Sequence, residues 1–283
     1  MPELPEVEVT RKGLAPYVEG ARVREIAVRT EKLRSPLDRG QLERLAGSRI
    51  TRLERRGKYL IWRLADDAGK PLGAVVSHLG MSGYWRVWPQ TPPAPGRHEH
   101  IDWVLESAEG KPPVTVRLTD PRKFSDFVFV EGEPLEQKPL SELGPEPWDE
   151  ALTPERFAAA LRATRRPVKE ALLAGRIVVG CGNIYASESL FLAGIDPRRR
   201  ADRISAARAA RLLAAVRETL EKAIAAGGST LRDFHGPDGA DGYFALQTNV
   251  YGREGLPCRQ CGTLVRRIVQ GARSTFFCPH CQH

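Results

Sequence analysis

The sequence of 283 residues lacks any run that approaches the ~18 consecutive apolar residues of a membrane-spanning helix. Its first residues are acidic and show no basic segment followed by an apolar one, so we expect no signal peptide and a cytoplasmic protein. There is no internal repeat and no low-complexity tract. With 41% hydrophobic and 28% charged residues, the composition is that of a globular protein with one large domain or two smaller ones.

Positive charge is in excess. Lys and Arg number 43 against 35 Asp and Glu, which gives a formal net charge of +8 at pH 7. Basic proteins often bind phosphates, because each neutralised phosphate releases condensed counterions. A surface charge that serves solubility explains the excess equally well. The charge alone therefore identifies no partner.

Cysteine is scarce, but four of the five cysteines form two pairs. Cys258 and Cys261 make one C-x2-C motif, Cys278 and Cys281 make another, and sixteen residues separate the pairs. Two such turns build a tetrahedral four-thiolate site, which predicts one structural zinc ion with no open coordination position. A redox pair is the alternative, and the doubled motif favours zinc over it. His280 could replace a cysteine ligand, but we interpret it as an exposed turn residue.

The first part of the chain, to about Val130, predicts β-structure. Runs that alternate or are rich in β-formers cover residues 23–28, 58–64, 74–79, 101–105, 114–118 and 127–130. Turn-forming segments separate them, and short strands at this spacing favour a sandwich or a barrel. One helix is expected before them, after Pro5. Its first amphipathic turns would carry Val7, Thr10, Arg11 and Leu14.

The pattern changes after residues 133–150, which are rich in Pro and Glu and which we interpret as a linker. Thr153 can cap a helix that has Pro154 at its first position. Residues 206–225 are dense in Ala, Leu and Arg and predict a long helix. The C-terminal residues return to short strands around the cysteines. The order is therefore β-structure, then helices, then a four-cysteine hairpin.

Four separated motifs together resemble one family. They are PELPEVE at Pro2–Glu8, RRGKYL at Arg55–Leu60, VVGCGNIYASESLFLAGIDP at Val178–Pro197, and QGARSTFFCPHCQ at the C-terminus. This combination resembles formamidopyrimidine-DNA glycosylase, the bacterial Fpg family. The match runs in the expected order from Pro2 to Gln282 and so covers essentially the whole chain.

The resemblance implies an α+β fold with two domains. A β-sandwich catalytic domain would span residues 1–132 and be followed by the linker. A helix–two-turn–helix DNA-binding domain would span 151–245, and a zinc-finger β-hairpin 246–283. The implied partner is double-stranded DNA containing oxidised purines or abasic sites, bound by a monomer on the bacterial nucleoid.

The resemblance also implies a bifunctional enzyme, a DNA glycosylase for 8-oxoguanine and formamidopyrimidines that is also an AP lyase. The residues that match the catalytic set of the family are Pro2, Glu3, Glu6, Lys58 and Arg273. Pro2 would be the nucleophile after removal of Met1, because a secondary amine can form an iminium at C1′. Taken alone, PELPE is better explained as a proline-stiffened arm with solvated acids. Lys58 and Arg273 alone would be solvated surface charges.

Further residues match DNA contacts of the family. They are Met81, His98, Arg122, Phe124, Asn183, Thr230 and Arg232. Met81, Arg122 and Phe124 would fill the gap left by the flipped base, although a Met or Phe in β-rich sequence is usually core. His98 begins an H-x-H pattern and would contact a phosphate. Thr230 and Arg232 would contact the extruded base.

The chain departs from the family pattern at five positions. Ala174 and Gly175 stand where an Asp-Gln pair is usual, Lys123 replaces a second arginine, and Ser125 replaces a glycine. Cys181, where Val, Ile or Leu is commoner, is interpreted as a small buried apolar residue.

Three alternatives remain. An endonuclease VIII-like glycosylase would act on oxidised pyrimidines, but such chains usually begin PEGPE. A non-catalytic, zinc-dependent protein that binds damaged DNA would not need Pro2 and Glu3. A zinc-ribbon transcription protein would leave the first two-thirds of the chain unexplained.

Overall fold

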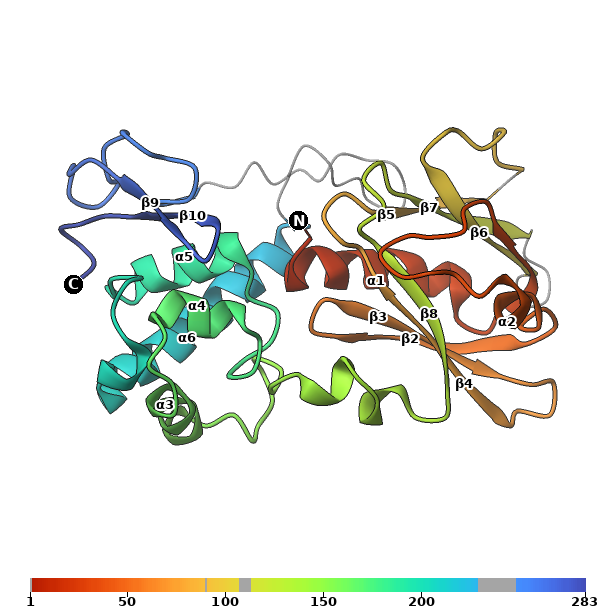
Figure 1. Ribbon diagram of the computed structural model, residues 1–283, viewed down its shortest axis with the longest axis horizontal. Helices are drawn as coiled ribbons and strands as arrows, with labels where there is room; N and C mark the ends of the chain where they lie inside the picture. The colour runs from red at the N-terminus through yellow and green to blue at the C-terminus, as the bar shows by residue number, and fades with distance from the viewer. Residues whose placement is uncertain (1, 90, 107–112, 229–247) are drawn as a thin grey trace. The chain divides into compact units, whose positions relative to one another are not determined.

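The computed structural model describes residues 2–89, 91–106, 113–228 and 248–283 (Figure 1). Contacts divide them into two compact units, 2–141 with 227–228, and 142–226 with 248–283. Across these described ranges, no helix is both long and apolar enough to pass through a membrane.

The first unit contains an antiparallel sheet of eight strands. The strands are β1 (Arg22–Val28), β2 (Arg49–Arg56), β3 (Tyr59–Ala65), β4 (Pro71–His78), β5 (Tyr84–Trp88), β6 (Glu99–Glu106), β7 (Val114–Thr119) and β8 (Asp126–Glu131). Their order is β5-β7-β6-β1-β2-β3-β4-β8. Strands β1 and β2 are joined through one residue pair, Arg22 opposite Arg49. The sheet thus consists of two four-stranded halves with a narrow connection.

Aromatic packing shows that the two halves face each other. Trp62 on β3 stacks on Trp103 of β6 with ring centroids 5.2 Å apart, and its edge meets Trp85 of β5 at 5.3 Å. Phe127 on β8 packs against both Trp85 and Trp103. All four side chains are buried, so they form the centre of a sandwich core. The predicted α+β fold with an N-terminal sandwich is confirmed.

Helix α1 (Leu4–Val18) opens the chain, as predicted, and α2 (Arg39–Glu43) follows β1. Thr10 and Leu14 are buried, and α1 packs against β2 and β3. A capping box starts the helix: the backbone N–H of Glu3 donates to the Glu6 carboxylate at 2.7 Å, and the Glu3 side chain accepts from the backbone of Glu6.

The second unit is helical and ends in a two-stranded hairpin. Its elements are α3 (Pro154–Arg162), α4 (Val168–Leu173), α5 (Asn183–Leu192), η3 (Ala201–Arg203), α6 (Ala206–Ala225), β9 (Arg266–Gln270) and β10 (Arg273–Phe277). Two short 3-10 turns, η1 (Pro134–Glu136) and η2 (Leu140–Glu142), precede α3. The side chain of Thr153 caps α3, as predicted. Helix α6 has the predicted bounds and packs on α3 and α5.

A buried ion-pair network joins β6 to β7 in the first unit. Arg117 donates two hydrogen bonds of 2.8 Å to the two carboxylate oxygens of Asp102, and Arg29 donates a third at 2.6 Å. Burial would raise the pKa of Asp102, but the hydrogen bonds from Arg117 and Arg29 outweigh burial and hold its pKa below 3.8.

We predict that Asp102→Asn lowers the free energy of unfolding at pH 7 by about 3–5 kcal/mol, because it leaves buried arginine charge uncompensated. The folded-state pKa of Asp102 is depressed, so its stabilisation is complete above pH 3.8 and is lost as the pH falls through the folded-state value. Urea unfolding followed by tryptophan fluorescence should show the difference from wild type shrinking below that pH. Asp67→Asn, which breaks an exposed pair with Arg22, is the control. Equal effects of the two substitutions would contradict the prediction.

Candidate active site and metal centre

The candidate nucleophile and two acids lie together at the start of α1. Pro2 is buried directly before the helix, Glu3 is 1% exposed, and Glu6 is fully buried. The capping box holds both carboxylates at the positive end of the helix, where negative charge is stabilised. Gly228 has φ +85°, and a Cβ there would lie 3.4 Å from Glu6 Cγ, so its backbone packs against this acid. Thr230 and Arg232 lie outside the described residues.

Arg55 connects α1 to the turn that carries Lys58. Its Nε donates to the Glu8 carboxylate at 2.9 Å, and its Nη1 donates to the Gly57 carbonyl at 3.1 Å. Burial would raise the pKa of Glu8, but the hydrogen bonds and charges of Arg11 and Arg55 outweigh it and lower that pKa. Arg55 of the RRGKYL motif therefore ties helix α1 to the turn directly before partly buried Lys58.

His78 is a candidate hydrogen-bond donor of the site that the sequence analysis did not identify. Burial, with the positive charges of Lys58 and Arg34, lowers the pKa of His78 to about 4. Its Nδ1 accepts a hydrogen bond from the Gly80 N–H at 3.0 Å, so the neutral ring carries its proton on Nε2. The structure thus places a neutral donor close to Lys58. The only signal in the sequence was its position just before the LGMSG motif.

The H-x-H pair divides into one exposed and one structural residue. The His98 side chain is exposed, whereas its carbonyl accepts from the Asp120 N–H. His100 is buried, and its Nε2 donates to the Asp120 carbonyl at 2.9 Å. Of the two, His98 is the one whose ring can reach a ligand from solvent.

Met81, Arg122 and Phe124 lie on two adjacent loops of the first unit. Met81 is 39% exposed and Phe124 is 44% exposed, which rules out a core role. The Arg122 guanidinium lies 4.9 Å from the centre of the Phe124 ring. Gly80 has φ +64°, and a Cβ there would lie 2.3 Å from the Phe124 carbonyl, so the loops are in direct contact. The side chains of Met81, Arg122 and Phe124 therefore lie on two loops that are in contact with each other.

In the second unit, Asn183 and Arg273 are linked through strand β10. Asn183 is the first residue of α5, and its Nδ2 donates to the Ser274 carbonyl at 2.9 Å. Buried Lys169 on α4 donates to Thr275 Oγ1 at 2.7 Å and so anchors the same strand. Arg273, the exposed first residue of β10, is held next to these anchors. Lys169 carries no sequence signal that would have identified it.

The departure at Ala174 and Gly175 has a structural account. Helix α4 ends at Leu173 with Ala174 as its C-cap, and Gly175 follows with φ +68°, the left-handed conformation that terminates helices. The Gly175 carbonyl then accepts a hydrogen bond from the Gly144 N–H at 2.8 Å. Here the glycine supplies a helix end.

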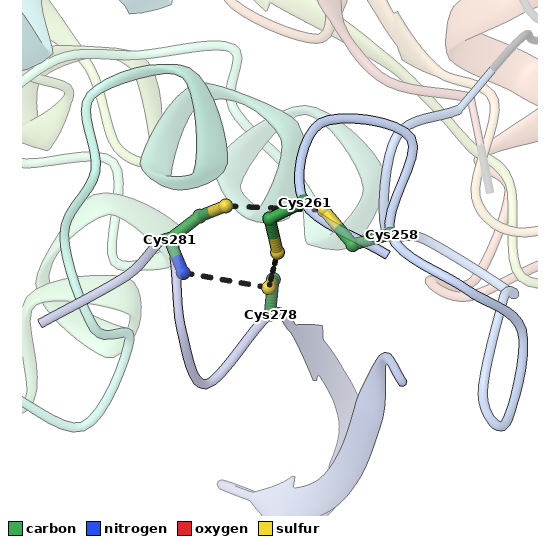
Figure 2. Close-up of side chains that lie close together, drawn as sticks. All are labelled: Cys258, Cys261, Cys278 and Cys281. Carbon is green, nitrogen blue, oxygen red and sulfur yellow. Dashed lines mark hydrogen bonds between the residues drawn. The ribbon is translucent and has the colours of Figure 1, made fainter. Parts of the chain in front are cut away.

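Figure 2 shows the four paired cysteines with their sulfur atoms turned toward one another. All four Sγ atoms lie within 4.8 Å of each other, with 3.9 Å between Cys258 and Cys281 and 3.5 Å between Cys261 and Cys278. Four thiolates at Zn–S distances of ~2.3 Å lie roughly 3.8 Å apart in a tetrahedron. The site therefore fits the predicted single structural zinc.

The chemistry of the four thiols agrees with this geometry. Burial raises the pKa of Cys278 and Cys281, whereas hydrogen bonds from Thr263 lower the pKa of Cys261 to about 6. Sulfurs this close cannot all ionise unless a cation compensates their charge. The fifth cysteine, Cys181, is 2% exposed, in agreement with a small apolar role.

Three family models match the chain. The formamidopyrimidine-DNA glycosylase N-terminal domain matches residues 1–127, and the H2TH domain of formamidopyrimidine-DNA glycosylase matches residues 143–235. A zinc finger found in FPG and IleRS matches residues 255–283.

Full-length relatives and solved structures agree with these matches. The formamidopyrimidine-DNA glycosylase of Cupriavidus pinatubonensis is 51% identical over 290 residues, which is the whole of both chains. The crystal structure of the MutM (FPG) protein from Thermus thermophilus is 40% identical, covers 99% of this chain and 98% of its own, and has a TM-score of 0.84. A MutM structure in complex with DNA containing carbocyclic 8-oxo-G is 31% identical over the whole of both chains, with a TM-score of 0.87.

We predict that Cys261→Ala removes the bound zinc while the first unit stays folded, because the hairpin has only a small core besides the metal. Zinc content by mass spectrometry and tryptophan fluorescence of the sandwich core would measure both effects. Cys181→Ala, a buried cysteine outside the cluster, should keep one zinc per chain. Full zinc occupancy in Cys261→Ala would contradict the assignment.

Proposed function

The chain belongs to the formamidopyrimidine-DNA glycosylase family, and on that premise we propose a base-excision repair enzyme that removes oxidised purines from duplex DNA. It also cleaves the strand at the resulting abasic site. The observation that carries the proposal is the group of Pro2, Glu3 and Glu6 buried at the start of α1. The MutM complex with 8-oxo-G DNA supports oxidised guanine as the substrate base.

Pro2 is the nucleophile of the proposed reaction. Removal of Met1 exposes a secondary amine, and free α-amino groups titrate near ~8, so an unprotonated amine is accessible at neutral pH. The amine nitrogen forms a bond to C1′, the sugar ring opens, and the base leaves with the electron pair of the glycosidic bond. The resulting iminium acidifies the C2′ proton, and its loss expels the 3′ phosphate. A second elimination then expels the 5′ phosphate.

Glu3 transfers the proton in the proposed reaction, and Glu6 assists by positioning Glu3. Glu3, next to the nucleophile, donates a proton to the ring oxygen as the sugar opens. Glu6 accepts the Glu3 N–H and so fixes the backbone from which Glu3 acts. Because both acids are buried beside Pro2, bulk water competes poorly for the transferred proton.

Each unit carries candidate phosphate contacts of its own. In the first unit, Lys58 would donate to a phosphate. In the second unit, the exposed Arg273 would do so, and Asn183 holds strand β10 beside it. The excess positive charge adds affinity for DNA that is independent of sequence. Such an enzyme would act on the bacterial nucleoid.

Borohydride should trap a covalent adduct between Pro2 and an 8-oxoguanine duplex, because it reduces the iminium to a stable amine. A protein whose N-terminus is extended by one residue keeps every side chain but converts the amine to an amide, and it should form no adduct. Glu3→Gln should bind the duplex and lose most excision. Mass spectrometry of the cross-linked N-terminal peptide identifies the site, and trapping by the extended protein would contradict the assignment of Pro2.

Excision of 8-oxoguanine should be faster opposite cytosine than opposite adenine, with Arg122 as the reason. The guanidinium has donors only, and cytosine offers two adjacent acceptors where adenine offers one acceptor beside a donor. One good bidentate contact gives roughly five- to 150-fold discrimination. Single-turnover excision on the two duplexes should show Arg122→Ala slowing the reaction opposite cytosine far more than opposite adenine. A ratio that the substitution leaves unchanged would remove Arg122 from this role.

A further inference from the structure

The carboxylate of Asp120 accepts hydrogen bonds from both of the loops that carry Met81, Arg122 and Phe124. Asp120 follows β7 and is fully buried. Its Oδ1 accepts from the Ser82 hydroxyl at 2.7 Å and from the Arg122 N–H at 3.2 Å. Its Oδ2 accepts from both the N–H and the hydroxyl of Ser125, each at 2.7 Å.

One of these bonds, from the Ser82 hydroxyl, joins residues 79–83 to residues 120–125, and the other three lie within residues 120–125. Gly83 closes the first loop by donating its N–H to the Leu79 carbonyl at 2.9 Å, and a Cβ on Gly83 would lie 3.2 Å from Ser125 Cβ. The second loop contains Lys123 with φ +55°, an uncommon conformation for a side-chain-bearing residue. The hydrogen bonds that Asp120 accepts within this turn therefore help to hold it in that conformation.

We propose that Asp120 is a positioning residue that sets the opposite-base preference by holding Arg122 in register with Met81. This inference rests on the proposed function. The Asp120 clamp, meaning Asp120 with its donors on Ser82, Arg122 and Ser125, fixes the backbone N–H of the arginine itself. A guanidinium that must meet two acceptors tolerates only small displacements, so its discrimination depends on the clamp.

Ser125 gives the clamp a donor that a glycine could not supply. Its hydroxyl doubles the hydrogen bonding to Oδ2 and is completely buried. The departure from the family pattern at this position is therefore an additional hydrogen bond within the clamp. Ser125→Gly or Ser125→Ala removes one donor and leaves the backbone donor in place.

Asp120→Asn is the most informative test of the clamp, because both carboxylate oxygens accept a hydrogen bond from a backbone N–H. Whichever way the amide is oriented, its NH₂ faces the N–H of either Arg122 or Ser125. The side-chain hydroxyls can rotate to accept, but the backbone donors cannot. One backbone hydrogen bond that shapes residues 120–125 is therefore lost while the volume of the side chain is almost unchanged.

The experiment measures single-turnover excision of 8-oxoguanine opposite cytosine and opposite adenine. Asp120→Asn should bring the ratio of rate constants to within about threefold of one, and Ser125→Ala should lower it less. Adding Ser125→Ala to Asp120→Asn should change the ratio no further, because both act through one clamp. A wild-type ratio that Asp120→Asn retains, or additive effects in the double variant, would overturn the inference.

Matched controls separate positioning from loss of stability. Asp102→Asn removes another buried carboxylate of the same unit, and Ser48→Ala removes another buried serine hydroxyl. Both should keep the wild-type ratio at a temperature where they are folded. If Asp102→Asn lowers the ratio as much as Asp120→Asn does, the effect belongs to stability and the inference fails.

Hydrogen exchange in the free protein tests the clamp without the reaction. Measured relative to the other peptides of the first unit, the peptide covering 120–125 should lose protection in Asp120→Asn but not in Asp102→Asn. Unchanged protection in Asp120→Asn would overturn the clamp even if the wild-type protein excises 8-oxoguanine. Absence of excision by the wild-type protein would instead count against the proposed function.

Discussion

Buried carboxylates that accept backbone N–H groups position the candidate functional residues of both units. Glu6 accepts from the N–H of Glu3 at the start of α1, and Asp120 accepts from two N–H groups of the loop that carries Arg122. In the second unit, Glu188 on α5 accepts from the N–H groups of three successive residues, 249–251, on the segment that leads to the zinc hairpin. An irregular segment without such a partner would bury unsatisfied donors at a cost of about 1–3 kcal/mol each.

This arrangement explains how exposed residues can be held accurately. Met81, Arg122 and Phe124 lie on loops, which are ordinarily the mobile part of a fold. A buried carboxylate is costly unless every oxygen is hydrogen-bonded, so each acid selects the one loop conformation that satisfies it. The candidate side chains can then remain exposed on a fixed backbone.

The sequence predicted the elements that depend on local patterns. Helix α6, the cap at Thr153 and the four-cysteine site follow from composition and spacing, which need no knowledge of distant residues. Strand β2 was missed because a register shift between Ile50 and Arg52 breaks its alternation, and β5 was missed because it lies between two turn-rich segments. The roles of Asp120 and Lys169 depend on partners brought close only by the tertiary structure, so no spacing rule could identify them.

The zinc hairpin depends both on a local sequence pattern and on contacts with distant residues. The metal site joins the loop before β9 to the turn after β10, and it is readable from the cysteines alone. The other end of β10 is held by Asn183 and Lys169, whose donors reach Ser274 and Thr275. Two anchors on one short strand leave it little freedom to slide or to tilt. The position of Arg273, the first residue of β10, therefore depends on helices α4 and α5 as well as on the metal site. The cysteine spacing alone therefore does not predict how the hairpin arginine is positioned, because Asn183 and Lys169 lie on helices outside the zinc finger.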